Sequence, residues 1–354
     1  MHGPEILSIF ENAEKNDLNY FEILGTDREN NSELSFPPRY AEYRKEWINR
    51  MYNNDPGSFP LHVDVESTNR CNLRCTMCQI DFASMKQGNI APEIFEKVLE
   101  ECSANHLPSM KFNYRGEPTM NRHLVDMIRK AKDAGIIEVQ FNTNGVLVNE
   151  TLARSLIEYG LDRIKFSIDG VSPEVYRKIR GTDYQNVVDN VRNLVRIRDE
   201  QGLIRPIVQV QMVFMQDNKE EVVRFFRFWK KIVNKIGFSR YRSKERLIDD
   251  ERRVSEAPLV RVPCSQLWQR LLVTYDGQIL MCCGDHKALN PLGNINEMSL
   301  KDAWNSKKLA TIREMHLNNE SEKIPACAIC EVNCTDPDTA ITIWERVKRN
   351  VQIS

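Results

Sequence analysis

The sequence has no continuous apolar run long enough to cross a membrane, and its first residues lack the basic start and apolar stretch of a secretory signal. It has no excess of either charge, because 49 lysines and arginines nearly cancel 50 aspartates and glutamates. We find no internal repeat and no low-complexity segment. These absences argue against nucleic acid or a membrane as the main partner. They favour a cytoplasmic globular protein that acts on a small molecule or a peptide.

Ten cysteines in a chain of 354 residues then need an explanation. In a reducing compartment they are not expected to form disulfides, so clustered cysteines indicate metal or redox chemistry. Cys102 is set apart from the clusters, because it follows Phe95, Val98 and Leu99 at helical spacing. We expect it to be a buried core thiol.

Short apolar runs alternate with amphipathic stretches from residue 61 onward. They predict strands at 61–67, 110–114, 138–143, 163–169, 207–214 and 236–242, and helices near 91–103, 121–133, 148–159, 184–200 and 218–234. Six strand-helix units are too few for a full eight-fold barrel. The pattern predicts an α/β fold with a partial (β/α)6 TIM-like barrel, whose chemistry gathers at the carboxyl ends of the strands.

Five regions follow from the same pattern. We predict an amino-terminal extension at 1–59, with a helix begun by Pro37 and Pro38, and a barrel at 60–240. The charged stretch after the last strand predicts a linker, and a smaller cysteine-rich domain follows it. These two regions and a carboxyl-terminal tail are predicted at 241–262, 263–345 and 346–354.

The first cysteine group, "NRCNLRCTMCQ", places Cys71, Cys75 and Cys78 just after the first predicted strand. Closely spaced thiolates suit either zinc or an iron-sulfur cluster. A structural zinc site needs four protein ligands, and the nearest candidates for a fourth are His62 and Cys102. The first begins a predicted strand and the second lies inside a predicted helix. Three ligands would leave a metal position open for a substrate or cofactor.

The spacing C-x3-C-x2-C, with the apolar Met77 before the last cysteine, resembles the signature of the radical S-adenosylmethionine (radical SAM) superfamily. The resemblance implies that Cys71, Cys75 and Cys78 bind three irons of a [4Fe-4S] cluster. S-adenosylmethionine would then chelate the fourth iron, which explains the missing ligand. Zinc binding or a purely structural role is the alternative.

Segments at the ends of the next predicted strands also resemble this family. "YRGEP" is similar to its G-G-E-P segment, although Arg115 replaces the first glycine, and "FNTNG", "FSIDG" and "RKIRG" follow in order. The resemblance implies that the cosubstrate contacts Gly116, Glu117, Pro118, Asn144, Ser167 and Arg180. Ser167 would meet its ribose and Arg180 its carboxylate. The alternative is that the glycines are turn residues and the arginine a solvated charge.

The second cysteine group lies near the carboxyl terminus. Cys264, Gly277 and Cys282 fit C-x12-G-x4-C, and Cys327 with Cys330 forms C-x2-C. The set resembles the SPASM auxiliary-cluster domain, and more closely its shortened form, the twitch domain. The resemblance implies one auxiliary [4Fe-4S] cluster, held by these four cysteines. A zinc ribbon is the alternative.

Three further residues are candidates for catalysis. Cys283 and Cys334 are left without a cluster, and either could donate a hydrogen atom to a substrate radical, replace a ligand or be structural. Asp285, three residues beyond Cys282, could accept a proton or be a solvated loop acid.

The resemblance implies an oxidoreductase that cleaves S-adenosylmethionine to a 5′-deoxyadenosyl radical, with an electron donor such as flavodoxin or ferredoxin. The first interpretation is oxidation of an alcohol carbon of a sugar-like or aminocyclitol-like small molecule, with the auxiliary cluster as electron acceptor. Two alternatives are redox-neutral epimerisation of a carbohydrate centre and modification of a ribosomal peptide. An iron-sulfur protein that only carries electrons is the non-enzymatic alternative.

Overall fold

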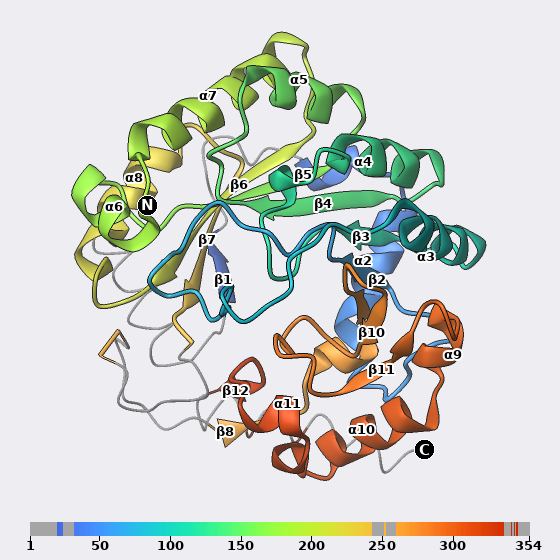
Figure 1. Cartoon of the computed structure of the whole chain (residues 1–354). Coiled ribbons are helices and arrows are strands. Elements are labelled where there is room, and N and C mark those ends of the chain that lie inside the picture. Colours follow the sequence, from blue (N-terminus) through green and yellow to red (C-terminus); the bar gives the residue numbers. More distant parts are fainter. Residues whose placement is uncertain are drawn as a thin grey trace. The chain divides into compact units, whose positions relative to one another are not determined.

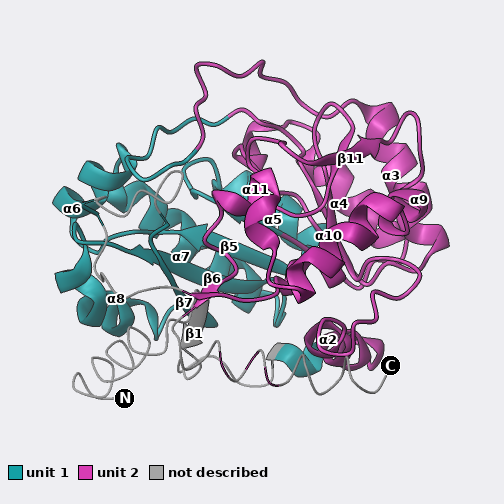
Figure 2. Ribbon diagram, turned by 90° about the horizontal axis from the view of Figure 1, so that it is seen from below, with its two compact units in different colours: residues 1–35, 71–79, 141–258 teal, residues 36–70, 80–140, 259–354 magenta. Residues whose placement is uncertain are grey.

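The computed structural model describes residues 20–23, 32–242, 251–252 and 260–335, together with 341, 343 and 345. It divides into two compact units (Figure 2), the first drawn from 1–35, 71–79 and 141–258 and the second from 36–70, 80–140 and 259–354. The predicted tail and most of the predicted linker lie outside the described residues. The division into five regions therefore stays a prediction.

The first unit contains three parallel strands, β5 (Arg163–Ser167), β6 (Ile207–Phe214) and β7 (Lys235–Arg240), and β1 (Tyr20–Ile23) pairs antiparallel with β7. Helices lie along one face of β5 to β7 (Figure 1): α5 (Glu150–Glu158), α6 (Pro173–Arg180), α7 (Tyr184–Glu200) and α8 (Val222–Trp229). Two 3-10 helices complete the unit, η1 (Ser32–Ser35) and η3 (Lys219–Glu221).

Local chemistry sets the helix boundaries next to the candidate site. Helix α6 ends at Gly181, whose φ of +72° is a conformation that glycine adopts without strain. Helix α7 begins at Tyr184, because the side chain of the preceding Asp183 accepts the backbone N–H of Asn186 as an N-cap. The carboxyl end of α6 is thereby fixed at Arg180.

The second unit is built on parallel strands β2 (His62–Val65), β3 (Ser109–Lys111) and the first half of β4 (Glu138–Thr143). Strand β9 (Arg270–Val273) pairs parallel with β2, and the antiparallel strands β10 (Gln278–Leu280) and β11 (Pro291–Asn294) follow it. Strands β8 (Val260–Arg261) and β12 (Cys334–Thr335) form a separate pair.

Short helices complete the second unit. The α-helices are α2 (Arg39–Asn49), α3 (Pro92–Ala104), α4 (Leu124–Asp133), α9 (Leu300–Trp304), α10 (Lys307–Leu317) and α11 (Pro325–Ala328). The 3-10 helices are η2 (Pro118–Met120), η5 (Ser265–Trp268) and η6 (Ser321–Lys323).

The strands and helices predicted from periodicity are confirmed, and the fold is α/β with parallel strands. Cys102 is fully buried in α3, as expected for a core thiol. Helix α6 was not predicted, and neither was the pairing of β9 with β2. That pairing makes residues 270–273 part of the same sheet as the first parallel strand.

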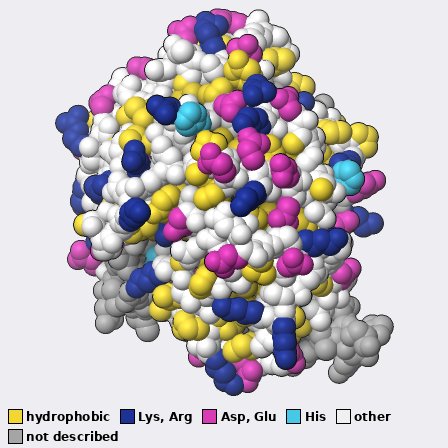
Figure 3. All heavy atoms as spheres, turned by 45° about the vertical axis from the view of Figure 1, so that its right-hand side comes forward, with side chains coloured by type: hydrophobic (Ala, Val, Ile, Leu, Met, Phe, Trp, Pro, Cys, Tyr) yellow, Lys and Arg dark blue, Asp and Glu magenta, His cyan; other side chains and the backbone are white. Residues whose placement is uncertain are grey.

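The surface agrees with the balanced charge of the sequence. On the face drawn in Figure 3, basic and acidic side chains are interspersed. Within the described part of the chain, no helix is long and apolar enough to span a membrane.

Candidate functional site

The first cysteine loop, residues 71–79, is anchored in the first unit by contacts of Thr76 and Met77, which lie between the cysteines, with residues distant in the sequence. The backbone N–H of Thr76 donates to the carbonyl of Ile179 at 3.0 Å. The side chain of Met77 packs against a buried cluster of Ile179, Met215 and Tyr241. The apolar residue before the third cysteine therefore has a structural purpose, because it holds the loop against the end of α6.

Two of the predicted cosubstrate residues contact this loop. The Asn144 side chain donates from Nδ2 to Oδ1 of Asn72 at 2.7 Å. Arg180 donates from its guanidinium to Sγ of Cys75 at 3.5 Å and pairs with the fully buried carboxylate of Asp169. A cationic donor beside sulfur stabilises a thiolate, which is the form of cysteine that binds iron.

Ser167 is the last residue of β5, opposite Gln211 of β6, and its side chain is partly exposed. This is the carboxyl end of a parallel strand, where the fold places its chemistry. A contact with the ribose stays a prediction.

The predicted G-G-E-P-like segment packs on the residues that lead into the cysteine loop. A Cβ on Gly116 would lie 2.3 Å from the Thr68 carbonyl oxygen and 2.6 Å from that of Arg70, so only glycine allows this approach. The Glu117 N–H donates to the Arg70 carbonyl at 2.8 Å, and its buried carboxylate accepts from Thr119. Pro118 begins η2, where its missing N–H costs nothing.

Arg115, where the segment departs from the family pattern, has its own partner. Its guanidinium forms two hydrogen bonds with the fully buried carboxylate of Glu66, which also accepts the N–H of Tyr275. The neighbouring Tyr114 hydroxyl donates to the carbonyl of Asp285. The segment is therefore tied to the loop that carries Cys282.

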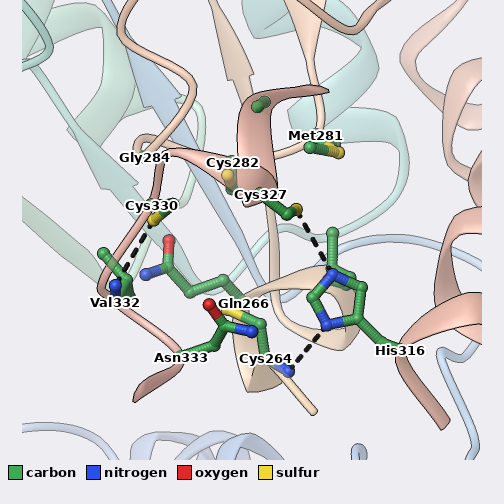
Figure 4. Close-up of a pocket in the computed structure, with 12 residues that line it drawn as sticks. Cys264, Gln266, Met281, Cys282, Gly284, His316, Cys327, Cys330, Val332 and Asn333 are labelled. Atoms are coloured by element: carbon green, nitrogen blue, oxygen red, sulfur yellow. Dashed lines mark hydrogen bonds between the residues drawn. The ribbon is translucent and has the colours of Figure 1, made fainter. Parts of the chain in front are cut away.

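Four cysteines line one pocket in the second unit (Figure 4). Cys264 precedes η5, Cys282 follows β10, Cys327 lies in α11, and Cys330 comes shortly after it. The sequence prediction of these four as one group therefore agrees with their placement around a single pocket. Among the described residues, no group of three or more His, Cys, Asp or Glu side chains is placed to hold a single metal ion.

The chemistry of the pocket fits thiolate ligands of a cluster. Burial, reinforced by the other thiols, raises the pKa of Cys264 to about 12 and also raises the pKa values of Cys282 and Cys327. A bound cationic centre reverses this effect by holding the thiols deprotonated. Cys330 Sγ accepts the backbone N–H of Val332 at 3.3 Å, a contact that favours the thiolate.

The two leftover cysteines differ in their surroundings. Cys283 is partly exposed; its thiol donates to Oε1 of Gln266 at 3.2 Å and receives a guanidinium N–H of Arg270 at 3.7 Å. Cys334 is fully buried on β12, and its thiol faces the Cys330 carbonyl at 3.9 Å. Neither lines the pocket of the four cysteines.

Asp285 is buried, and both carboxylate oxygens accept backbone N–H groups, from Leu289 at 2.8 Å and Asn290 at 2.9 Å. These bonds shape the loop that follows Cys282. A role in proton transfer stays a prediction.

The sequence reasoning missed His316 of α10, which lines the pocket beside Cys327. A signal was available, because Leu309, Ile312 and His316 lie three and four residues apart, which places them on one face of the helix, and all three are buried. A histidine on a buried face needs polar partners, and the nearest ones here belong to the cysteine pocket.

Comparison with protein-family models decides the class. The Radical SAM superfamily model matches residues 65–228, and the model of the iron-sulfur cluster-binding domain called SPASM matches residues 264–335. The chain is a radical SAM protein with a SPASM domain. Its parallel strands are those of a radical SAM partial barrel, followed by the SPASM region. Its cofactors are a [4Fe-4S] cluster with S-adenosylmethionine and SPASM-bound iron-sulfur.

Among curated relatives, the tungsten-containing aldehyde ferredoxin oxidoreductase cofactor-modifying protein of Pyrococcus furiosus is 24% identical over 80% of this chain and 95% of its own length. A probable GTP 3′,8-cyclase of Sulfurisphaera tokodaii is 34% identical, but over only 37% of this radical SAM chain and 42% of that protein.

Solved structures share the fold of this chain at low sequence identity. BtrN in complex with AdoMet and 2-DOIA has a TM-score of 0.53 at 17% identity, covering 78% of this chain and 92% of that one. The anSMEcpe structure with bound AdoMet has a TM-score of 0.56 at 16% identity, covering 83% and 95%. Streptococcus suis SuiB bound to the precursor peptide SuiA has a TM-score of 0.58 at 14% identity, covering 76% and 70%.

Proposed function

We propose that the protein is a radical SAM dehydrogenase that oxidises an alcohol carbon of a sugar-like or aminocyclitol-like small molecule. The observation that carries the proposal is the pocket of Cys264, Cys282, Cys327 and Cys330, which offers four thiolates to one auxiliary [4Fe-4S] cluster. A cluster with four protein ligands has no open iron for substrate, so it suits electron acceptance.

When bound, the two cofactors supply a 5′-deoxyadenosyl radical that takes a hydrogen atom from the substrate carbon and an acceptor for a second electron, so that the alcohol becomes a ketone. The alcohol also loses its hydroxyl proton, so the substrate loses two hydrogens in total. An external donor such as flavodoxin or ferredoxin would supply the electron that cleaves S-adenosylmethionine, and the electron taken up by the auxiliary cluster would return to the oxidised donor, so that no net electron is consumed.

The chain's own residues hold and orient these groups. Cys71, Cys75 and Cys78 would bind the first cluster, with the Arg180 guanidinium beside Cys75. Gly116 lets the following Glu117 and Pro118 pack against the residues before Cys71, which fixes the segment that would receive the amino group of the cosubstrate.

Two relatives support a small molecule over a peptide as the substrate. The Pyrococcus furiosus protein, which aligns over most of both chains, is named for modifying a cofactor. BtrN was crystallised with the compound abbreviated 2-DOIA. SuiB was crystallised with a peptide, so peptide modification is the outcome to be separated by experiment.

The test is an anaerobic reaction of the reconstituted full chain with S-adenosylmethionine, a reductant and a panel of polyols, aminocyclitols and peptides. We expect one polyol or aminocyclitol to yield a product lighter by two hydrogens, together with 5′-deoxyadenosine. Cys282→Ala should keep cleavage of the cosubstrate and lose the ketone, whereas Cys75→Ala should lose both. A ketone formed at the wild-type rate by Cys282→Ala would contradict the proposal.

A second candidate function is epimerisation of a carbohydrate centre. The observation that favours it is the partly exposed thiol of Cys283, next in sequence to Cys282 and held between Gln266 and Arg270. A thiol in that position could return a hydrogen atom to a substrate radical. The product would then have the mass of the substrate, which distinguishes it from the ketone.

A further inference from the structure

His316 lies in α10, is 1% exposed, and contacts two of the four cysteines of the auxiliary pocket. Its Nδ1 faces the backbone N–H of Cys264 at 3.3 Å, and its Nε2 faces Sγ of Cys327 at 3.3 Å. Figure 4 shows the ring between these two groups, with a dashed line to each. The histidine therefore bridges two segments that would both ligate the cluster.

The first contact decides where the ring proton lies. A backbone N–H can only donate, so Nδ1 must be the acceptor, and in a neutral imidazole Nε2 then carries the hydrogen. That hydrogen points toward the sulfur of Cys327.

We propose that His316 is a positioning residue that donates its Nε2–H to Cys327 Sγ and thereby raises the reduction potential of the auxiliary cluster. The inference rests on the proposed function, because it takes Cys327 as a cluster ligand. Hydrogen bonds to cluster sulfurs are among the factors that set such potentials. The bond is stronger to the more negative, reduced cluster, so it favours the reduced state.

The donor would make the cluster a better acceptor for the second electron of the proposed oxidation. A neutral donor is suited to this role, since its effect does not depend on a proton being taken up. The Val332 N–H to Cys330 Sγ gives the pocket a second donor of the same kind, which a side-chain substitution leaves in place.

The test is an EPR-monitored redox titration of the full chain, reconstituted with iron and sulfide, in which Cys71, Cys75 and Cys78 are replaced by alanine so that only the auxiliary cluster reports. His316→Phe removes the donor. His316→Gln can keep it, because its amide oxygen can accept from Cys264 and its NH2 can donate to Cys327. His123→Gln, on a histidine outside the pocket, is the matched control.

We expect His316→Phe to change the oxidised-to-reduced ratio at a fixed potential by about tenfold toward oxidised, which is a fall of about 59 mV for one electron. His316→Gln should restore most of the shift, and His123→Gln should match the parent chain. An exchangeable proton coupled to the cluster in ENDOR spectra should disappear in His316→Phe.

An unchanged potential in a His316→Phe chain that retains about four irons would overturn the proposal. Loss of the cluster from both His316 variants would also overturn it, because His316 would then be a ligand or a structural requirement. The ligand assignment is tested separately, with Cys282→Ala in the same background. If this variant keeps its iron and its spectrum, the assignment of the cluster ligands is wrong, and the proposed function is contradicted independently of the hydrogen bond from His316.

Discussion

The guanidinium of Arg115 forms a two-pronged ion pair with the carboxylate of Glu66, with Nε to Oε1 and NH2 to Oε2 both at 2.8 Å. Glu66 is fully buried and directly follows β2, and Arg115 stands at the first glycine of the G-G-E-P pattern that residues 114–118 resemble. The residue that departs from the resembled pattern is therefore paired with the buried acid that follows β2.

Removal of one member of this pair should be costly. Arg115→Met leaves a buried carboxylate unpaired, and we expect a loss of about 3 kcal/mol in the free energy of unfolding. The double variant Glu66→Gln, Arg115→Met should recover most of that loss, because no buried charge remains. Anaerobic denaturant unfolding of the three proteins measures both effects. Equal free energies of unfolding for Arg115→Met and the wild type would show that the ion pair does not stabilise the fold.

Gly116→Ala should weaken binding of S-adenosylmethionine by about tenfold. The added Cβ would lie 2.3 Å from the Thr68 carbonyl oxygen and must push the segment away from the residues before Cys71. Gly135→Ala is the matched control, since Gly135 has a φ of +84° but nothing within 4 Å of a new Cβ. That change should cost about 1 kcal/mol of stability and leave binding unchanged. Equilibrium dialysis with labelled S-adenosylmethionine measures the binding affinity of the two variants and of the wild type.

The sequence predicted most of this architecture because its helices and parallel strands have clear periodicity; the ranges of α7 and β6 agree with the predicted ones residue for residue. The four cysteines that it grouped by their spacing line one pocket, and their role as cluster ligands stays a prediction. The sequence could not predict that β9 pairs with β2, because strand pairing between distant segments leaves no local signal. The ion pair of Arg115 with Glu66 could not be predicted for the same reason, because the two residues are far apart in the sequence.

Acid should destabilise the first unit through Glu33. Burial raises the pKa of this carboxyl, but hydrogen bonds and charges from Arg163 and Lys235 outweigh it and lower the pKa from 4.5 to about 2. The stabilisation is therefore present above pH 4.5 and is lost as the pH falls from 4.5 toward 2. As the pH falls from 4.5 toward 2, the unfolding midpoint of Glu33→Gln should therefore fall less than that of the wild type. Parallel pH curves for both proteins would contradict this. The side chain is 43% exposed, so solvent screening keeps the effect small.

Cys283→Ala separates the two proposed reactions. A dehydrogenase does not need a hydrogen-atom donor, so the variant should form ketone at close to the wild-type rate. An epimerase that needs this thiol as its hydrogen-atom donor should instead lose the epimerised product, because the substrate radical would no longer receive a hydrogen atom. Cys334→Ala is a useful comparison, because that thiol is fully buried and does not line the cysteine pocket. Mass spectrometry of substrate and product in deuterated water reads the outcome directly.

The central claim is that Cys71, Cys75 and Cys78 hold a cluster that cleaves S-adenosylmethionine. The measurement that tests it most directly is 5′-deoxyadenosine formation by the anaerobically reconstituted full chain with dithionite, with Cys75→Ala as the control and the proposed substrate panel present. The account predicts deoxyadenosine from the wild type and none from the variant. Equal amounts from both proteins, or none from wild-type protein shown to hold its clusters, would contradict it.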